Sequence, residues 1–291
     1  MLINNQCKEC ILKKYSVQHP EKISDEKKAQ YRAAIVKILE DFSPVLSAPE
    51  ILEKIAVLQK DMFDYSLDLT ECKKYYNALL LSMEDELWDN LTKSKDFFEL
   101  AIGYAMTGNY IDFGANSNIS EEFLKQKLNE SESLDYDKEE LENLRAEILK
   151  SKNLVFLTDN CGEIVTDKLL IRAILKLNPE INISVIVRGA NVLNDATLED
   201  ARDVGLDKLV SVHSNGTAIC GTALKRITPE CRCLLDNADV IISKGMGNFE
   251  TMYGCGKNVY YLLMCKCDMF ASRFKMPLFS CVLKNEKNLE L

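Results

Sequence analysis

The sequence predicts an α/β protein, an α/β/α sandwich with a mainly parallel Rossmann-like sheet and an N-terminal helical subdomain. In the first half of the chain, apolar residues recur at helical spacing. After Lys152, short apolar runs alternate with helical patterns, which is typical of a parallel, doubly wound sheet. We therefore expect two domains: a helical N-terminal subdomain over residues 1–150, and an α/β domain over residues 151–291 that carries the functional site.

The helical half carries its own start signals. An apolar stripe over residues 31–42 repeats at the spacing of one helix face. Ser47 followed by Glu50 forms a capping-box pattern ahead of a second stripe. Asp137 stands at the cap position before a third stripe, which includes Leu141. These signals predict a series of amphipathic helices.

The second half alternates strands with helices. Strands are predicted at residues 154–157, 183–187, 209–212, 240–243 and 278–283, with helices near residues 167–177, 198–204 and 231–236. The carboxyl ends of parallel strands meet at one edge of the sheet. Ligands of open parallel sheets bind beyond that edge, so the loops that follow the strands are the ones to examine for function.

Composition narrows the class of protein. The 291 residues carry a formal net charge of −9, which argues against a nucleic-acid binder. The longest apolar stretches, such as residues 259–264, are far shorter than the roughly 20 residues of a membrane-spanning helix. The N-terminus lacks a hydrophobic signal core. We expect a cytoplasmic enzyme that acts on a small molecule, with no nucleic-acid and no membrane partner.

Three polar loops follow the first, second and fourth predicted strands. Asp159 and Asn160 lie in the first loop, and Asp195 lies in the second. Carboxylate and amide oxygens suit Mg²⁺ or Mn²⁺, so these residues form a candidate metal site. Arg188 and Lys244 suit phosphate oxygens. The alternative is that Asp159 and Asp195 only cap helices, but three such loops at one edge favour a site.

Two other functions stay open on these residues. A Rossmann-like methyltransferase would need a glycine-rich first loop and an acidic residue after the second strand, where this chain has one glycine and Arg188. A non-catalytic phosphometabolite-binding protein would keep Arg188 and Lys244 without needing the candidate metal site. The motifs of nucleoside-triphosphate and dinucleotide binding are missing, as is the Gly-x-Ser-x-Gly elbow.

The three loops together resemble a known family, domain-of-unknown-function family eighty-nine, which has been recast as metal-dependent damage-control phosphatases. A further segment, residues 108–114, also looks like the family, and the likeness covers nearly the whole chain. The motifs that carry it are Asp159-Asn160-x-Gly162-Glu163, Arg188-Gly189-x-x-x-x-Asn194-Asp195 and Lys244-Gly245-x-Gly247-Asn248-x-Glu250.

The resemblance implies hydrolysis of small phosphate monoesters, such as sugar phosphates or damaged phosphometabolites, with Mn²⁺, Mg²⁺, Co²⁺ or Ni²⁺. Either a water molecule or Asp159 itself would attack the phosphorus. The site residues that it implies are the metal ligands Asp159, Asn160 and Asp195, the catalytic residues Asp159, Lys244 and Glu163, and the substrate-binding residues Arg188, Asn194, Lys244, Asn109 and Asp112.

The eleven cysteines include a Cys7-x-x-Cys10 pair, which resembles the mark of the family's prokaryotic-type subfamily, as does Cys267 after Lys266. A structural zinc normally needs four ligands, so the pair would need partners, which Cys265 and Cys267 or Cys231 and Cys233 could supply. A redox pair is the second reading, and two ordinary thiols on a helix turn are the third. We expect a structural or redox role, including a possible structural metal at these cysteines.

Overall fold

The computed structural model describes residues 1–111 and 120–289. It contains a six-stranded sheet in the order β3–β2–β1–β4–β5–β6. Neighbouring strands from β3 to β5 pair in parallel, whereas β6 pairs antiparallel with β5. The predicted fold class is therefore confirmed. The strands are β1 (Asn153–Leu157), β2 (Asn182–Val187), β3 (Ser211–Ser214), β4 (Val240–Lys244), β5 (Val259–Met264) and β6 (Cys281–Asn285).

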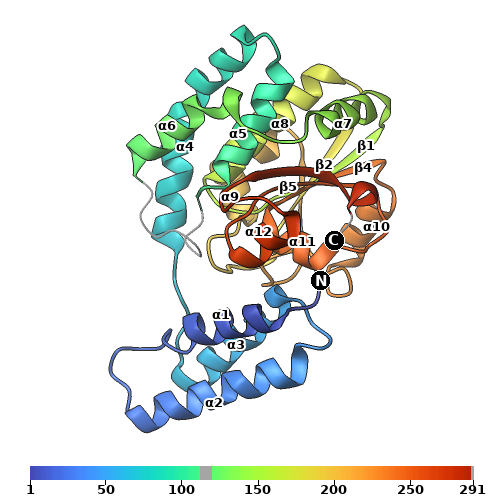
Figure 1. Cartoon of the computed structure of the whole chain (residues 1–291). Coiled ribbons are helices and arrows are strands. Elements are labelled where there is room, and N and C mark those ends of the chain that lie inside the picture. Colours follow the sequence, from blue (N-terminus) through green and yellow to red (C-terminus); the bar gives the residue numbers. More distant parts are fainter. Residues whose placement is uncertain (112–119, 290–291) are drawn as a thin grey trace.

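Helices precede and interleave the strands, as Figure 1 shows. The capping box of Ser47 and Glu50 and the cap of Asp137 form as predicted. The α-helices are α1 (Asn5–Tyr15), α2 (Asp25–Phe42), α3 (Ala48–Phe63), α4 (Thr70–Lys93), α5 (Phe97–Gly108), α6 (Glu121–Asn129), α7 (Lys138–Lys150), α8 (Glu163–Leu177), α9 (Leu198–Asp203), α10 (Pro229–Asp236), α11 (Gly245–Met252) and α12 (Asp268–Phe274).

The strand predictions differ from the structure in three places. Strand β5 was not predicted. Its six residues are all buried, and periodicity alone does not separate such an unbroken apolar run from a buried helix segment, whereas the equally buried β4 is marked by its β-branched residues. The last strand begins at Cys281 rather than at residue 278, because Leu278 and Phe279 are exposed and belong to the turn before it. Strand β3 lies two residues later than predicted.

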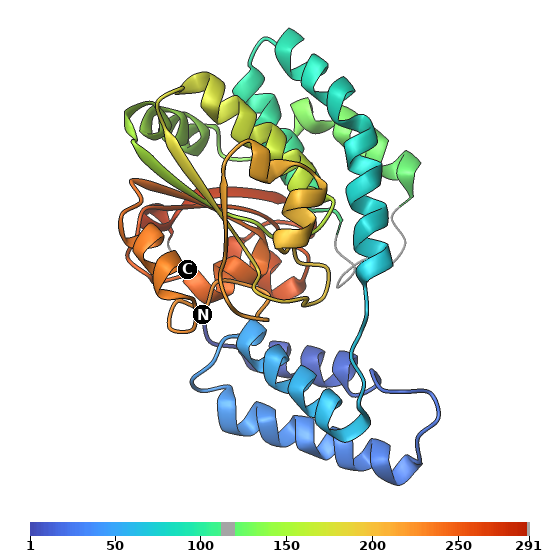
Figure 2. The same cartoon turned by 180° about the vertical axis from the view of Figure 1, so that it is seen from behind.

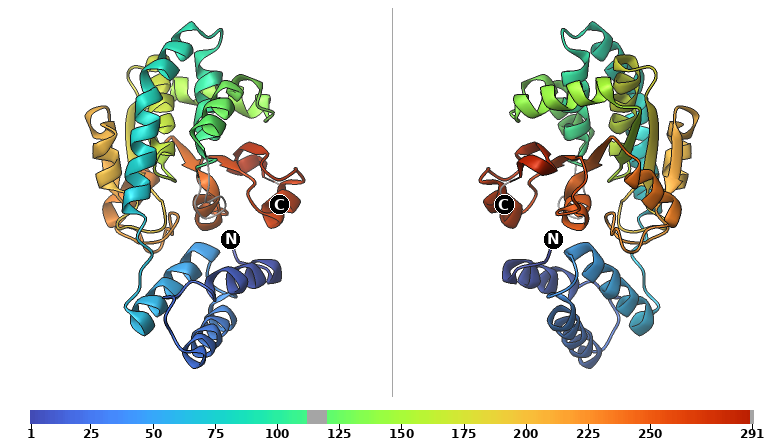
Figure 3. Two further views of the ribbon diagram at one scale, coloured as in Figure 1. Left: turned by 90° about the vertical axis from the view of Figure 1, so that its left-hand side faces the viewer. Right: turned by 90° about the vertical axis from the view of Figure 1, so that its right-hand side faces the viewer.

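The sheet separates two hydrophobic clusters. Alternate side chains of each strand point to opposite faces. On β1, Leu154 and Phe156 join a cluster with α4, α5, α7 and α8, whereas Val155 and Leu157 join a cluster with α10, α11 and α12. The edge-on views of Figure 3 show helices on both sides of the sheet. The three layers are those of an α/β/α sandwich.

Helices α1, α2 and α3 form a separate three-helix bundle with its own small core around Tyr31, Ile35 and Ile55. Figures 1 and 2 show this bundle at one end of the molecule, joined to α4 by residues 64–69. Helices α4 to α7 share the core of the sheet, so residue 150 does not mark a division between hydrophobic clusters. Within residues 1–111 and 120–289, no helix is long and apolar enough to cross a membrane.

Candidate active site

The polar loops after β1, β2 and β4 meet at the carboxyl edge of the sheet, because these three strands are neighbours. Backbone hydrogen bonds join the first two loops directly. The amide of Ala196 donates to the carbonyl of Asp159 at 2.7 Å, and the amide of Cys161 donates to the carbonyl of Asn194 at 2.7 Å. Asn160 and Asp195 form an isolated β-bridge. The three expected metal ligands therefore lie together.

Neither Asp159 nor Asp195 caps a helix. Helix α8 has Gly162 at its N-cap, and α9 has Thr197, whose hydroxyl and amide both donate to Asp200 at 2.8 Å. Both aspartates are nonetheless almost fully buried. The capping alternative is contradicted, and burial of two carboxylates with no capping role needs another explanation, because burying charge is costly.

Arg188 links the two aspartates. Its Nε donates to Oδ2 of Asp195 at 2.6 Å, and its Nη2 lies 3.7 Å from Oδ1 of Asp159. The side chain is fully buried, and neither terminal nitrogen has a hydrogen-bond partner among the described residues. Burial raises the pKa of Asp159 well above its usual value, and the neighbouring Asp195 raises that pKa further. The site thus holds a buried guanidinium, whose terminal nitrogens have no hydrogen-bond partner among the described residues, beside two buried carboxylates.

Asn160 is held in one orientation. Its Nδ2 donates to Oδ2 of Asp159 at 2.9 Å and to Oε2 of Glu163 at 2.8 Å. Its Oδ1 accepts a hydrogen bond from Nδ2 of Asn194 at 2.8 Å. Because Nδ2 donates to two carboxylates, Oδ1 of Asn160 must point away from Asp159 and Glu163, toward Asn194. Asn160 and Asn194 therefore both lie at the candidate site, as expected from the sequence.

Lys244 is fully buried, and three protein acceptors surround its ammonium. These are Oε1 of Glu163 at 2.6 Å, Oδ1 of Asp167 at 2.6 Å and the carbonyl of Ala105 at 2.8 Å. An ammonium has three donors, so direct phosphate contact, the role expected for Lys244, would require it to leave one of these acceptors. In this arrangement Lys244 instead neutralises a buried acidic pair.

The two carboxylates of this pair differ in electrostatics. Burial raises the pKa of Glu163, but Lys244, Lys266 and the hydrogen bond from Asn109 together hold the pKa below its usual value. Burial raises the pKa of Asp167 to about 7, and Lys244 offsets this only in part. Sequence reasoning missed Asp167. It lies one helical turn after Glu163 on α8, and that spacing was the available signal.

Asn109, at the C-terminus of α5, reaches into the site as expected. Its Nδ2 lies 3.2 Å from Oδ2 of Asp159 and 2.9 Å from Oε2 of Glu163, and its Oδ1 accepts from the amide of Met264 at 3.3 Å. It therefore joins the carboxylates to the end of β5. Asp112, the other residue expected from the helical half, lies outside the described residues.

A fourth loop, after β3, supports the loops after β2 and β4 and was not predicted. Oδ1 of Asn215 accepts from the amides of Gly189 at 3.0 Å and Thr217 at 2.9 Å. The hydroxyl of Thr222 donates to Oδ1 of Asn248 at 2.8 Å. The signal was available in principle, since this loop also follows the carboxyl end of a parallel strand.

A cavity of about 430 Å³ lies between the three-helix bundle and this edge of the sheet. Leu52, Ala56 and Val57 of α3 line one side of it. Asn191, Val192 and Leu193 line another side, and they come directly before Asn194 and Asp195 in the chain. One loop therefore contributes to both the cavity and the candidate metal site.

The cysteines of the expected structural or redox group are free thiols. Cys7 and Cys267 both pack against the cluster under α11 and α12, and burial raises the pKa of each, whereas Cys10 is exposed. Among the described residues, no three His, Cys, Asp or Glu side chains come together as a metal-binding group. Asp159, Asn160 and Asp195 are a different kind of group, because one of the three is an amide. The role of the cysteines stays a prediction.

Comparisons with known proteins identify the family of this chain. Residues 3–282 match the family described as the damage-control phosphatase ARMT1-like domain. A damage-control phosphatase of Pyrococcus horikoshii is 37% identical over 200 residues, which are 67% of each chain. An uncharacterized protein of Methanocaldococcus jannaschii is 28% identical over 97% of this chain and 94% of its own.

A damage-control phosphatase of Archaeoglobus fulgidus is 35% identical over 61% of this chain and 62% of its own length. The crystal structure of a DUF89 family protein from Pyrococcus horikoshii superimposes with a TM-score of 0.79 and 26% identity, covering 98% of this chain and 99% of that one. The family match spans almost all of the sequence, including every loop of the site. The chain therefore belongs to the damage-control phosphatase family with the ARMT1-like domain.

Proposed function

We propose that this protein is a metal-dependent phosphatase that hydrolyses small phosphate monoesters, such as sugar phosphates or damaged phosphometabolites. Membership of the damage-control phosphatase family supports the reaction class. The observation that carries the proposal is the buried pair Asp159 and Asp195 beside Arg188, whose terminal nitrogens have no hydrogen-bond partner among the described residues.

Asp159, Asn160 and Asp195 fit a hard divalent cation. Their oxygens come from two carboxylates and one oriented amide, the donors that Mg²⁺ and Mn²⁺ prefer, and Co²⁺ or Ni²⁺ also accepts them. A cation at this place offsets the mutual repulsion that raises the pKa of Asp159. When bound, the metal supplies charge neutralisation for the phosphoryl oxygens.

The remaining side chains have distinct roles in this proposal. Arg188 binds phosphate oxygens through its terminal nitrogens, which have no hydrogen-bond partner among the described residues, and arginine is favoured over lysine for such contacts. Glu163 orients the amide of Asn160, and Lys244 keeps Glu163 ionised. Attack by Asp159 would form a P–O bond to its carboxylate and release the alcohol, whereas attack by water would not modify the protein. Trapping of the acyl phosphate with hydroxylamine separates the two routes.

The cavity beside Leu193 receives the non-phosphate part of the substrate in this proposal. Replacing Ala56, which lines it from α3, with Trp would fill part of this space. Ala56→Trp should raise KM for hexose phosphates more than for the smallest phosphate monoesters. Val17→Trp, at an exposed position of the bundle, is the control and should leave both values unchanged.

Release of inorganic phosphate from a panel of monoesters, with metal-free protein and with each of Mn²⁺, Mg²⁺, Co²⁺ and Ni²⁺, tests the proposal. We expect no turnover after chelation and restored turnover with at least one of these ions. Full activity of exhaustively metal-free protein would refute metal dependence. Binding of phosphate esters without turnover under every condition would favour a non-catalytic binding protein, and transfer of a methyl group would favour a methyltransferase.

A further inference from the structure

Two buried polar residues of α4 lie beneath the loops of the candidate active site. Lys73 and Asn77 are one helical turn apart, and both side chains are almost fully buried. Neither belongs to the three polar loops or to the segment that carries Asn109. Burial of an ammonium and an amide is costly unless their hydrogen bonds are satisfied, so their partners indicate what they hold in place.

Asn77 joins the first loop to helix α9. Its Oδ1 accepts from the amide of Gly162 at 2.6 Å, and its Nδ2 donates to Oδ1 of Asp200 at 2.9 Å. Gly162 has φ of +70° and follows Asn160 by two residues. The turn that presents Asp159 and Asn160 is therefore fixed from below by a side chain of another helix.

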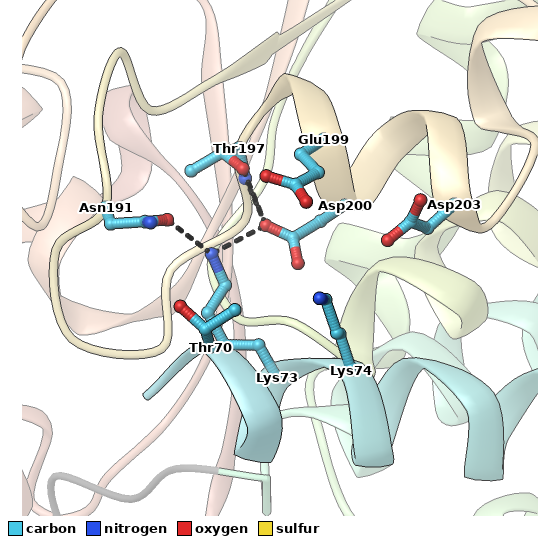
Figure 4. A pocket seen from close by; sticks show the side chains of 8 residues that line it. All are labelled: Thr70, Lys73, Lys74, Asn191, Thr197, Glu199, Asp200 and Asp203. Atoms are coloured by element: carbon cyan, nitrogen blue, oxygen red, sulfur yellow. Dashed lines mark hydrogen bonds and ion pairs between the residues drawn. The ribbon is translucent and has the colours of Figure 1, made fainter. Parts of the chain in front are cut away.

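Lys73 joins the loop after β2 to Asp200, the residue that Asn77 also contacts. Its Nζ lies 2.7 Å from Oδ2 of Asp200 and 3.1 Å from Oδ1 of Asn191, and Figure 4 shows it between these two residues. Asp200 also accepts from the amide and hydroxyl of Thr197, which follows Asp195 by two residues. Lys73 therefore contacts the segments on both sides of Asp195, through Asn191 before it and Asp200 after it.

We propose that Lys73 and Asn77 are positioning residues that set the separation of the two metal-binding loops before the metal arrives. This inference rests on the proposed function, since it assigns the ligands to Asp159, Asn160 and Asp195. Both loops are anchored to one rigid helix, so the oxygens of the site are preorganised, and binding need not order them. Loss of either anchor should weaken metal binding about 10- to 100-fold, as for other groups that orient metal ligands.

Titration calorimetry with Mn²⁺ on purified full-length protein tests the proposal. Lys73→Met keeps the length of the side chain but loses its charge, and Asn77→Leu loses both hydrogen bonds of the amide. Both should weaken Mn²⁺ binding about 10- to 100-fold. Lys73→Arg should restore most of the affinity. Asn77→Ser, which is smaller and less disruptive to folding, should show the same direction of change.

The matched control is Glu84→Gln. Glu84 also lies on α4 and accepts from Nζ of Lys168 at 2.6 Å, but this pair joins α4 to α8 and not to the loops. It should lower Tm and leave Mn²⁺ affinity unchanged. If the Lys73 and Asn77 variants lower Tm but bind Mn²⁺ as tightly as wild type, the two residues only stabilise the fold and the inference fails. If wild-type protein binds no Mn²⁺ and needs no metal, the proposed function itself fails.

Discussion

The carboxylate of Asp159 lies directly against the α-carbon of Gly245. A Cβ atom built on Gly245 would fall 1.9 Å from Oδ2 of Asp159, and the backbone of Gly245 has φ of +76°. Gly245 begins helix α11, immediately after Lys244 at the end of β4. The loop after β4 thus closes on the loop after β1 so tightly that a side chain at this point would displace the aspartate.

Gly245→Ala should abolish activity and metal binding. The new methyl group cannot coexist with the observed position of Asp159. Gly254→Ala provides the control, because Gly254 also has a positive φ, +83°, but has nothing within 4 Å of an added Cβ. Both variants carry backbone strain of about 1 kcal/mol, whereas only Gly245→Ala should lose Mn²⁺ binding. Equal turnover by the two variants would show that the contact with Asp159 has no functional role.

Asp159→Asn should lose nearly all phosphatase activity and most of the rise in Tm that metal induces. Without metal, its Tm should equal or exceed that of wild type, because a buried carboxylate with a raised pKa is replaced by a neutral amide. Differential scanning calorimetry with and without Mn²⁺, together with phosphate release, gives both quantities. Normal hydrolysis of phosphate esters by this variant would show that Asp159 is not part of the active site.

Arg188→Lys should reduce kcat/KM by about a hundredfold or more, because one ammonium cannot bridge Asp195 and a phosphate as a guanidinium does. The loss of stability in this variant should be modest, since the positive charge stays. Arg188→Met removes the cation that contacts both Asp159 and Asp195, and it should be more destabilised in metal-free protein than in Mn²⁺. Unchanged kinetics in Arg188→Lys would mean that the unpaired nitrogens do not meet the substrate.

Asp167→Asn should change how stability depends on pH. Because the pKa of Asp167 is raised from 3.8 to about 7 in the folded protein, the folded state keeps a proton that the unfolded state has lost. Its stabilising contribution is full below pH 4 and disappears as pH rises through about 7. Asparagine stays neutral, so the variant should gain stability relative to wild type between pH 4 and 7.

Urea unfolding at several pH values measures this difference. Asp236→Asn is the control, because Asp236 is exposed in a surface pair with Lys257 and its pKa is lowered, not raised. Parallel pH profiles of wild type and Asp167→Asn would show that Asp167 does not titrate in this range.

Lys244→Met should be strongly destabilising, because it leaves Glu163 and Asp167 buried without a cation. It should also lose turnover by about a hundredfold or more, because Glu163 no longer holds Asn160 as an ionised acceptor. In the double variant Lys244→Met/Asp167→Leu, stability should partly return while turnover stays low. Recovery of turnover along with stability would show that Lys244 serves only to hold the fold together.

Much of the fold could be predicted because its signals are local. The Ser47–Glu50 capping box, the apolar stripes and five of the six strands are each determined by a few neighbouring residues, so periodicity and turn residues reveal them, although β3 and β6 begin later than predicted. Strand β5 could not be recognised in this way, since its leucines and methionine suit a buried helix segment as well as a strand. The sequence also did not reveal that α4 to α7 share one hydrophobic core with the sheet, because that core depends on contacts between segments that are distant in the chain.

For the site, the sequence by itself determined which residue types follow the strands, and parallel topology then brought Asp159, Asn160 and Asp195 together. Only the tertiary structure decided what each side chain does there. It placed the ammonium of Lys244 between Glu163 and Asp167. It also placed Asn77, which is 85 residues from Gly162 in the chain, on that residue's amide. The reason is physical: a strand end fixes where a residue emerges, but the direction of its side chain depends on which charges and donors from distant helices meet it in the buried interior.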